Sequence, residues 1–397
     1  MKIATGKGNI PLITVVAIMS ISAIVSLPGL AISPILNYID TIFPHASRLE
    51  VEMLESLPSL MIIPFMLLAG RWSVRFSKLR LLIIGTAIFF MSGVGCILSQ
   101  TLIELIITSS LLGIGAGIII PLSTGLIVDY FTGDRRVSML GISSAVNNLT
   151  LVLATFAVGY LADKEWHLAF IVYLLPIVTL ILVPVLNHTP PSPEPEHGAQ
   201  HRQTSVNGGV IVGLMLLYFV ITYCSLVVTF NTSYIVGDNH LNANLSGTII
   251  SLFFLAIMLP GFMLNPIVRT LGKWVNMWSL IVMGVGLMIM AMPSPSAWSL
   301  SIGAVLIGIG YGVMQPIIYD KAATNAPPHL ATYALAIVMV INYLAILLAP
   351  FIIDGLDILF DRDTSTFAFL LNAIVIFLLA LVTLLVAPRS RVLGSDD

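Results

Sequence analysis

The chain has 397 residues, of which 58% are hydrophobic and only 9% are charged, and its formal net charge is −2. Soluble domains carry about 25% charged residues, so this composition excludes an ordinary soluble domain and indicates a protein built largely in lipid. The nearly neutral net charge argues against nucleic acid, or a strongly acidic molecule, as a partner.

Apolar segments long enough to cross a bilayer recur along the whole chain. A spanning helix needs roughly 20 apolar residues, and the runs are continuous rather than alternating as in barrel strands, so they predict helices. The first run is too long for a cleaved signal and contains Pro28, so we interpret it as a span. Twelve segments result, covering residues 10–37, 52–70, 79–99, 103–127, 138–161, 167–187, 209–232, 247–268, 275–293, 298–323, 331–355 and 364–387.

The distribution of lysine and arginine predicts the orientation of these helices. With the amino terminus inside, 13 of the 17 basic residues are cytoplasmic, three are outside and Lys321 lies within a helix. This excess follows the positive-inside rule and predicts a multi-pass protein of the cytoplasmic (inner) membrane with both termini in the cytoplasm. The thirteen are Lys2, Lys7, Arg71, Arg75, Lys78, Arg80, Arg135, Arg136, Arg202, Arg269, Lys273, Arg389 and Arg391.

One long polar interruption, His188–Gly208, divides the twelve segments into six and six. Its many prolines indicate an extended or disordered linker, and we favour this interpretation over a metal site made by its histidines. We therefore predict an all-α membrane protein with a six-helix bundle over residues 1–187, a cytoplasmic linker over 188–208 and a second six-helix bundle over 209–397.

The two halves share a glycine pattern in their fourth helices. Gly113–Gly117 reads GIGAG and is followed by Pro121, and Gly308–Gly312 reads GIGYG and is followed by Pro316, at a constant offset of 195 residues. A parallel repeat of this kind relates the halves by an axis along the membrane normal and places a substrate cavity between them near the midplane. Small residues at this spacing also let helices approach closely, so the pattern fits a packing role equally well.

The loop between the second and third helices carries a recognisable motif. It follows the pattern G-x-x-x-D-R-x-x-[RK]-x-[RK] at Gly70, Arg75, Lys78 and Arg80, but Val74 occupies the acidic position. With this loop, the twelve-helix topology and the glycines of the fourth helix, the chain resembles the major facilitator superfamily, and within it the bacterial drug–proton antiporters.

Other motifs of the antiporter branch are incomplete. Ser109 stands where an arginine associated with proton transfer is expected, and Gly141–Thr150 lacks the Gly-Pro pair of the antiporter motif in helix five. The stretch Trp166–Phe170 is similar to the W-R-x-x-F of bacterial members, with His167 in place of arginine. The resemblance therefore implies the fold and alternating access, whereas the direction of transport stays open.

The motif loop implies a conformational latch on the cytoplasmic side. Because Val74 removes the usual acid, we expect Asp129 or Asp134 to pair with the basic residues of the loop and to stabilise an outward-open state. The alternative is an ordinary solvated loop. The residues of this predicted cytoplasmic gate are Gly70, Arg75, Lys78, Arg80, Asp129, Arg135 and Arg136.

Asp320 and Lys321 lie in an otherwise apolar stretch of the tenth segment. Each ionisable group at membrane depth costs about 2.5–3.5 kcal/mol on insertion scales, so such residues are paired or functional. Desolvation favours the neutral form of a carboxylate, so Asp320 is the candidate proton carrier. The alternative is a structural ion pair with Lys321 reaching the headgroups. Glu55 is a second candidate for proton coupling, or else an interfacial carboxylate at a helix start.

Polar residues in the apolar segments are candidates to line a substrate cavity. An amide or phenol in lipid requires a partner, so each contacts either a substrate or another helix. The candidates are Asn147, Asn148, Gln315, Tyr319, Asn342, Tyr343 and Tyr223.

These observations predict a secondary transporter working by alternating access, with proton-coupled efflux of small amphipathic or hydrophobic, drug-like compounds. Uptake or exchange of a metabolite is the alternative within this class, and a non-transporting receptor or assembly protein is the alternative outside it. The sequence contains no nucleotide-binding loop and no hydrolase motif, so we expect no enzyme activity, cofactor or metal, and an ion gradient as the energy source. The expected partners are the substrate, protons and the lipid bilayer, and the resemblance implies a monomer.

Overall fold

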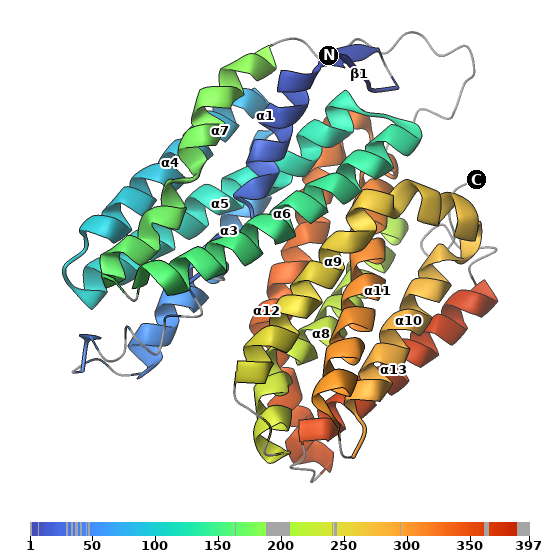
Figure 1. The fold of residues 1–397 in the computed structure, drawn as a ribbon. Helices are drawn as coiled ribbons and strands as arrows, with labels where there is room; N and C mark the ends of the chain where they lie inside the picture. Colours follow the sequence, from blue (N-terminus) through green and yellow to red (C-terminus); the bar gives the residue numbers. More distant parts are fainter. Residues whose placement is uncertain are drawn as a thin grey trace. The chain divides into compact units, whose positions relative to one another are not determined.

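The computed structural model describes residues 2–386 except 7, 29–30, 33–34, 36–38, 40–41, 45, 47, 163, 188–206, 240, 242–243, 294 and 361–364. Long helices dominate the described residues (Figure 1). They are α1 (Leu12–Ala23), α3 (Arg48–Trp72), α4 (Lys78–Leu98), α5 (Leu102–Tyr130), α6 (Gly133–Ala162), α7 (Pro176–Leu182), α8 (Gly208–Asp238), α9 (Asn244–Leu271), α10 (Val275–Met290), α11 (Ala297–Thr324), α12 (Ala331–Phe360) and α13 (Ser365–Val386).

Short elements complete the described fold. A hairpin of β1 (Lys2–Ala4) and β2 (Asn9–Pro11) precedes α1. The 3₁₀ helices η2 (Trp166–Leu174) and η3 (Val183–Asn187) flank α7, and η4 (Gly272–Trp274) and η5 (Pro328–Leu330) precede α10 and α12.

The helices confirm the predicted all-α membrane fold. Nine helical runs in the described residues are long and apolar enough to cross a membrane, and one of them, residues 245–290, covers two predicted segments. The shorter apolar helices Leu12–Ala23 and Ser56–Trp72 account for the two remaining segments.

The first predicted span is not one continuous helix. After Ala23 the backbone tightens, with the N–H groups of Ile24 and Val25 bonding three residues back. The N–H of Ser26 then bonds the side chain of Asn147 on α6 at 3.1 Å instead of a helix carbonyl. Pro28 has no N–H to resume the ladder. The helical pattern therefore stops within the predicted segment 10–37.

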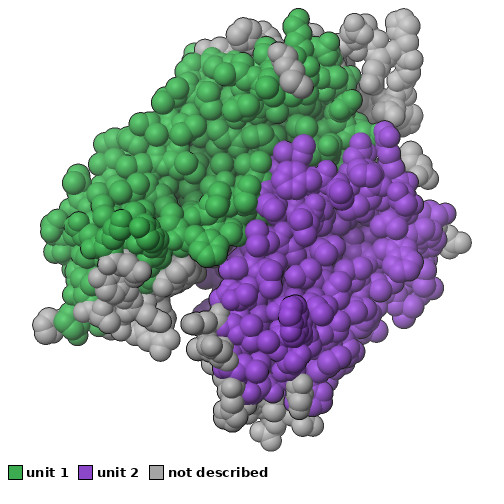
Figure 2. All heavy atoms as spheres, in the orientation of Figure 1, with its two compact units in different colours: residues 1–139, 146–206, 323–343 green, residues 140–145, 207–322, 344–397 purple. Residues whose placement is uncertain are grey.

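Two compact units make up the chain, and each is described by itself (Figure 2). Unit 1 comprises residues 1–139, 146–206 and 323–343, and unit 2 comprises residues 140–145, 207–322 and 344–397. Helices α6, α11 and α12 therefore contribute residues to both units. Most of the predicted linker lies outside the described residues, and the predicted bundle boundaries stay a prediction.

Within unit 1, the glycines of α5 form close helix–helix contacts. A methyl group added at Gly113 or Gly117 would lie 2.2 Å from the Pro58 carbonyl oxygen or 2.8 Å from that of Ile62, both on α3. One added at Gly115 would lie 2.7 Å from the backbone of Phe89 on α4. The α5 glycines thus face two neighbours alternately, and a larger residue does not fit.

Within unit 2, the glycines of α11 repeat this arrangement. Gly308 and Gly312 approach the carbonyl oxygens of Phe253 and Ile257 on α9 at 2.5 and 2.4 Å, and Gly310 approaches that of Ser279 on α10 at 2.5 Å, again measured from an added methyl group. Phe253 and Ile257 stand 195 residues after Pro58 and Ile62. The contacts therefore follow the same offset as the glycines, which supports both the repeat and a packing role for it.

Candidate functional site

A cluster of aromatic and amide side chains joins α8 and α11 in unit 2. The hydroxyls of Tyr218 and Tyr319 lie 2.7 Å apart. The Nε2 of Gln315, one turn before Tyr319, donates to the Tyr218 hydroxyl at 3.0 Å and to the Tyr319 hydroxyl at 3.3 Å. The two tyrosine rings meet edge to face with centroids 5.6 Å apart. Two rings and one amide thus form a surface with both apolar and hydrogen-bonding character.

The other end of the Gln315 amide is also held. Ser144, in the part of α6 that belongs to unit 2, donates to Oε1 of Gln315 at 3.1 Å. Both ends of the amide therefore have partners that fix its orientation. Tyr218 is fully buried, whereas Gln315 and Tyr319 are half-buried. Ser144 is half-buried as well, so the buried Tyr218 is joined by three members of the cluster that are partly accessible.

A second contact extends this polar face along the same two helices. The hydroxyls of Thr222 on α8 and Tyr311 on α11 lie 3.4 Å apart, and both residues are buried. Tyr311, Gln315 and Tyr319 are spaced by four residues, which places them on one face of α11. We call these six residues the tyrosine–glutamine cluster: Ser144, Tyr218, Thr222, Tyr311, Gln315 and Tyr319.

Asp320 and Lys321 follow directly after this face of α11. Lys321 has only 4% of its surface exposed, and Asp320 is half-buried. Both residues take part in interactions of the fold. Burial of the Lys321 side chain fits either a functional charge or a structural ion pair, so the role of both residues in proton coupling stays a prediction. A buried lysine beside a carboxylate is the arrangement expected of a functional or paired charge.

Asn147 makes its hydrogen bonds within unit 1. Its Oδ1 accepts from the N–H of Ser26 at 3.1 Å, and its Nδ2 donates to the hydroxyl of Ser26 at 2.7 Å. The amide thus stabilises the break after α1, and its role in a substrate cavity stays a prediction. The neighbouring Asn148 is buried and also has a partner within the fold.

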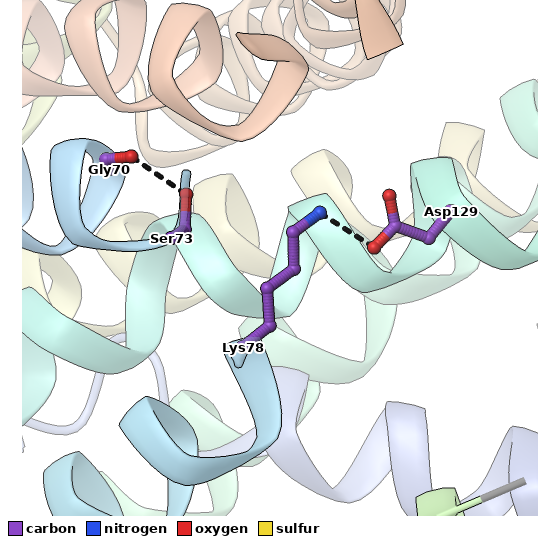
Figure 3. A network of polar contacts seen from close by, with 4 residues as sticks. All are labelled: Gly70, Ser73, Lys78 and Asp129. Atoms are coloured by element: carbon purple, nitrogen blue, oxygen red, sulfur yellow. Dashed lines mark hydrogen bonds and ion pairs between the residues drawn. The ribbon is translucent and has the colours of Figure 1, made fainter. Parts of the chain in front are cut away.

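The end of unit 1 that the sequence predicts to be cytoplasmic contains an ion pair. Nζ of Lys78, at the start of α4, lies 2.6 Å from Oδ2 of Asp129, in the last turn of α5 (Figure 3). This pairing is one of those that the sequence predicts, because either Asp129 or Asp134 is expected to pair with the basic residues of a loop whose acid is replaced by Val74. Its role in gating stays a prediction.

Other residues of the motif loop make contacts of their own. The hydroxyl of Ser73 donates to the Gly70 carbonyl at 2.7 Å and closes the turn after α3 (Figure 3). A methyl group added at Gly70 would lie 2.6 Å from Cβ of Ala336 on α12, within unit 1. Gly70 therefore allows a close approach between these helices. Arg75 and Arg80 are exposed.

The remaining candidates are dispersed. Glu55 lies on α3, but its side chain is outside the described residues. Asn342 and Tyr343 are half-buried on α12, and Tyr223 is buried on α8. Arg135 is exposed and Arg136 half-buried at the start of α6. In the described part of the chain, no group of three or more potential metal ligands lies together.

Sequence reasoning missed the role of Ser144 and the hairpin before α1. Ser144 is one of several small polar residues in α6, and its spacing carries no signal for a contact with α11. The hairpin strands are three residues each, too short for an alternating pattern to be informative. The Ser144 contact joins distant parts of the chain, whereas the hairpin pairs residues that are close in sequence.

Apolar helices of membrane length, with glycine contacts that repeat between two halves, define a polytopic α-helical membrane protein with internal duplication. The chain belongs to the Major Facilitator Superfamily, whose sequence model matches residues 12–350 and 214–396. Among curated relatives, "Multidrug resistance protein 3" of Bacillus subtilis (strain 168) is 27% identical over 173 residues, which are 42% of this chain and 32% of that protein. The chain thus aligns with about a third of the length of this relative.

Solved structures show the same fold. The proton:xylose symporter XylE, bound to 6-bromo-6-deoxy-D-glucose, has a TM-score of 0.74 with 15% identity, covering 95% of each chain. The human organic anion transporter MFSD10 (TETRAN) has a TM-score of 0.70 with 14% identity, covering 93% of this chain and 96% of that chain. At these identities the likeness concerns the fold alone.

Proposed function

We propose that the protein is a secondary active transporter that exports small amphipathic compounds across the cytoplasmic membrane in exchange for protons. The observation that carries this proposal is the position of Asp320 and buried Lys321, which directly follow the tyrosine–glutamine cluster on α11. A proton-binding group and a surface suited to an amphipathic molecule thus share one helix. The similarity to a multidrug resistance protein supports drug-like substrates.

In this proposal the cluster binds the substrate and Asp320 carries the proton. The rings of Tyr218 and Tyr319 contact the apolar part of the substrate, and the Gln315 amide exchanges a partner in the cluster for a polar group of the substrate. Asp320 binds a proton when it is shielded from water and releases it when the opposite side opens.

Proton-coupled uptake is the second candidate. The missing Gly-Pro pair of α6 leaves this direction open. The same cluster and the same carboxylate serve either direction. Direction is therefore a separate question from coupling.

The test uses the purified chain in proteoliposomes with a lipophilic cationic dye as the probe. A pH gradient of either sign is imposed, and dye movement and proton flux are followed together. Exchange predicts that dye and protons move in opposite directions, and uptake by symport predicts movement in the same direction. Binding of dye without any movement under either gradient would contradict transport and would favour a receptor.

A matched pair of glutamine variants locates the binding surface. Gln315→Ala removes the amide at the centre of the cluster, and we expect it to weaken dye binding about tenfold, as for the loss of a hydrogen bond in a buried site. Gln100→Ala changes an exposed glutamine next to α5 and should leave binding unchanged. Equal dye affinity of the two variants would remove the cluster from the binding site.

A further inference from the structure

The hairpin before α1 is small for an independent structure. Strands β1 and β2 pair antiparallel, with Lys2 opposite Pro11 and Ala4 opposite Asn9. In the turn, the N–H and the hydroxyl of Thr5 both donate to the Gly8 carbonyl, at 2.8 and 3.0 Å. An isolated two-stranded hairpin is marginally stable at best in water. Its order in the fold therefore depends on what it is packed against.

The hairpin packs against the connection between α5 and α6, within unit 1. The N–H of Thr132 donates to the Thr5 carbonyl at 3.0 Å. Gly6 has a φ of +85°, and a methyl group added there would lie 2.5 Å from Oγ1 of Thr132. Thr5 is fully buried, and Ile10 of β2 is 5% exposed. The contact therefore combines a backbone hydrogen bond, a close glycine approach and buried side chains.

The connection between α5 and α6 also lies close in sequence to Asp129 of the Lys78–Asp129 ion pair. Helix α5 ends at Tyr130 and α6 begins at Gly133, so only Phe131 and Thr132 join them. Asp129 lies three residues before Thr132 and pairs with Lys78 at 2.6 Å. Pro11, at the other end of the hairpin, is the residue that caps α1. The hairpin therefore links the start of α1 to the two-residue connection that directly follows the last helical turn of α5, where Asp129 lies.

We propose that the Lys2–Pro11 hairpin positions Asp129 for its ion pair with Lys78, so that undocking the hairpin weakens the pair. The physical reason is that a two-residue connection has few alternative conformations, and one of its backbone donors is fixed by Thr5. Thr5 and Gly6 are thus positioning residues. Any consequence for transport rests on the proposed function, whereas the effect on the ion pair does not.

The test measures the ion pair without transport. Amine-reactive labelling of Lys78 is followed by mass spectrometry in proteoliposomes without a gradient, together with hydrogen exchange of residues 125–139. Gly6→Ala strains the positive φ and collides with Thr132. We expect it to raise the labelling rate of Lys78 about fivefold, the factor that corresponds to one net hydrogen bond. Gly272→Ala is the matched control, because it has a φ of +50° and nothing within 4 Å of the added methyl group.

A double variant separates positioning from general loosening. Asp129→Asn should raise Lys78 labelling by itself, and Gly6→Ala should add nothing further in that background. The proposal would be overturned if the two substitutions had additive effects on Lys78 labelling. It would also be overturned if Gly6→Ala speeds hydrogen exchange at Thr132 but leaves Lys78 labelling unchanged. Should Gly6→Ala reduce expression, deletion of residues 2–6 undocks the hairpin without strain and must give the same result. Loss of transport in the wild-type protein would contradict the proposed function but not this inference.

Discussion

Replacing Gly113 by alanine tests the repeated packing of α5 and α11. The new methyl group would lie 2.2 Å from the Pro58 carbonyl oxygen and 2.7 Å from its Cα. Both atoms belong to backbone, which cannot turn aside as a flexible side chain does. Helix α5 must therefore move by about 1 Å, or α3 must yield by the same amount, to restore ordinary contact distances.

The expected cost follows from two opposing terms. Overpacking of a tight interface typically costs about 1–3 kcal/mol. Alanine in place of glycine in a helix interior recovers up to about 1 kcal/mol of helix propensity. We therefore expect Gly113→Ala to lower the free energy of unfolding by about 1–2 kcal/mol. Gly308→Ala should cost a similar amount, because its added methyl group would lie 2.5 Å from the backbone of Phe253.

The assay is thermal unfolding of the purified variants in one detergent, with Gly159→Ala as the matched control. Gly159 also lies in a long helix, α6, but nothing stands within 4 Å of an added methyl group. It should be neutral or slightly stabilising. If Gly113→Ala unfolds at the same temperature as Gly159→Ala, the close packing is wrong. If Gly308→Ala differs in sign from Gly113→Ala, the equivalence of the two helices is wrong.

Further predictions concern the polar contacts of the fold. Asn147→Ala should lower the free energy of unfolding by about 1–3 kcal/mol, because it leaves the N–H of Ser26 unsatisfied. The affinity for dye should not change. Thermal unfolding and equilibrium binding measure the two effects. Lys78→Asp should increase cysteine accessibility at the end of α5 that carries Asp129, and the swapped pair with Asp129→Lys should restore the original accessibility. Failure of the swap to restore it would argue against an ion pair as the latch. Gln315→Glu removes the donor to both tyrosine hydroxyls, so the affinity for a cationic dye should change, whereas Asn147→Ala should leave that affinity unaffected. Equal dye affinity in both variants would contradict the assignment of the cluster.

The helices were predictable because lipid imposes a single requirement on each of them. A spanning segment must be apolar over roughly 20 residues, and this is visible without knowledge of any neighbour. The glycine pattern was also predictive, since Gly113 and Gly308 mark close contacts through the absence of a side chain. The Lys78–Asp129 pair was foreseen because removal of the acid at Val74 leaves a basic loop that requires another counterion.

The polar contacts were less predictable, because each depends on which helix faces which. Ser26 and Asn147 are 121 residues apart, and neither side chain indicates a break in the first span. The bond between Ser144 and Gln315 joins positions 171 residues apart. Of the seven cavity candidates, Gln315 and Tyr319 are joined by a hydrogen bond, and the partners that complete their cluster could be found only from the fold.

The central claim is that uphill transport is driven by protonation of Asp320, and Asp320→Asn tests it most directly. Asparagine mimics a permanently protonated carboxyl group, so the variant should fold, bind dye and allow downhill exchange. It should not concentrate dye against its gradient in proteoliposomes with an imposed pH gradient, whereas the wild-type protein should. The account is contradicted if Asp320→Asn still concentrates dye with unchanged dependence on pH, and Glu55 would then become the leading candidate for the proton site.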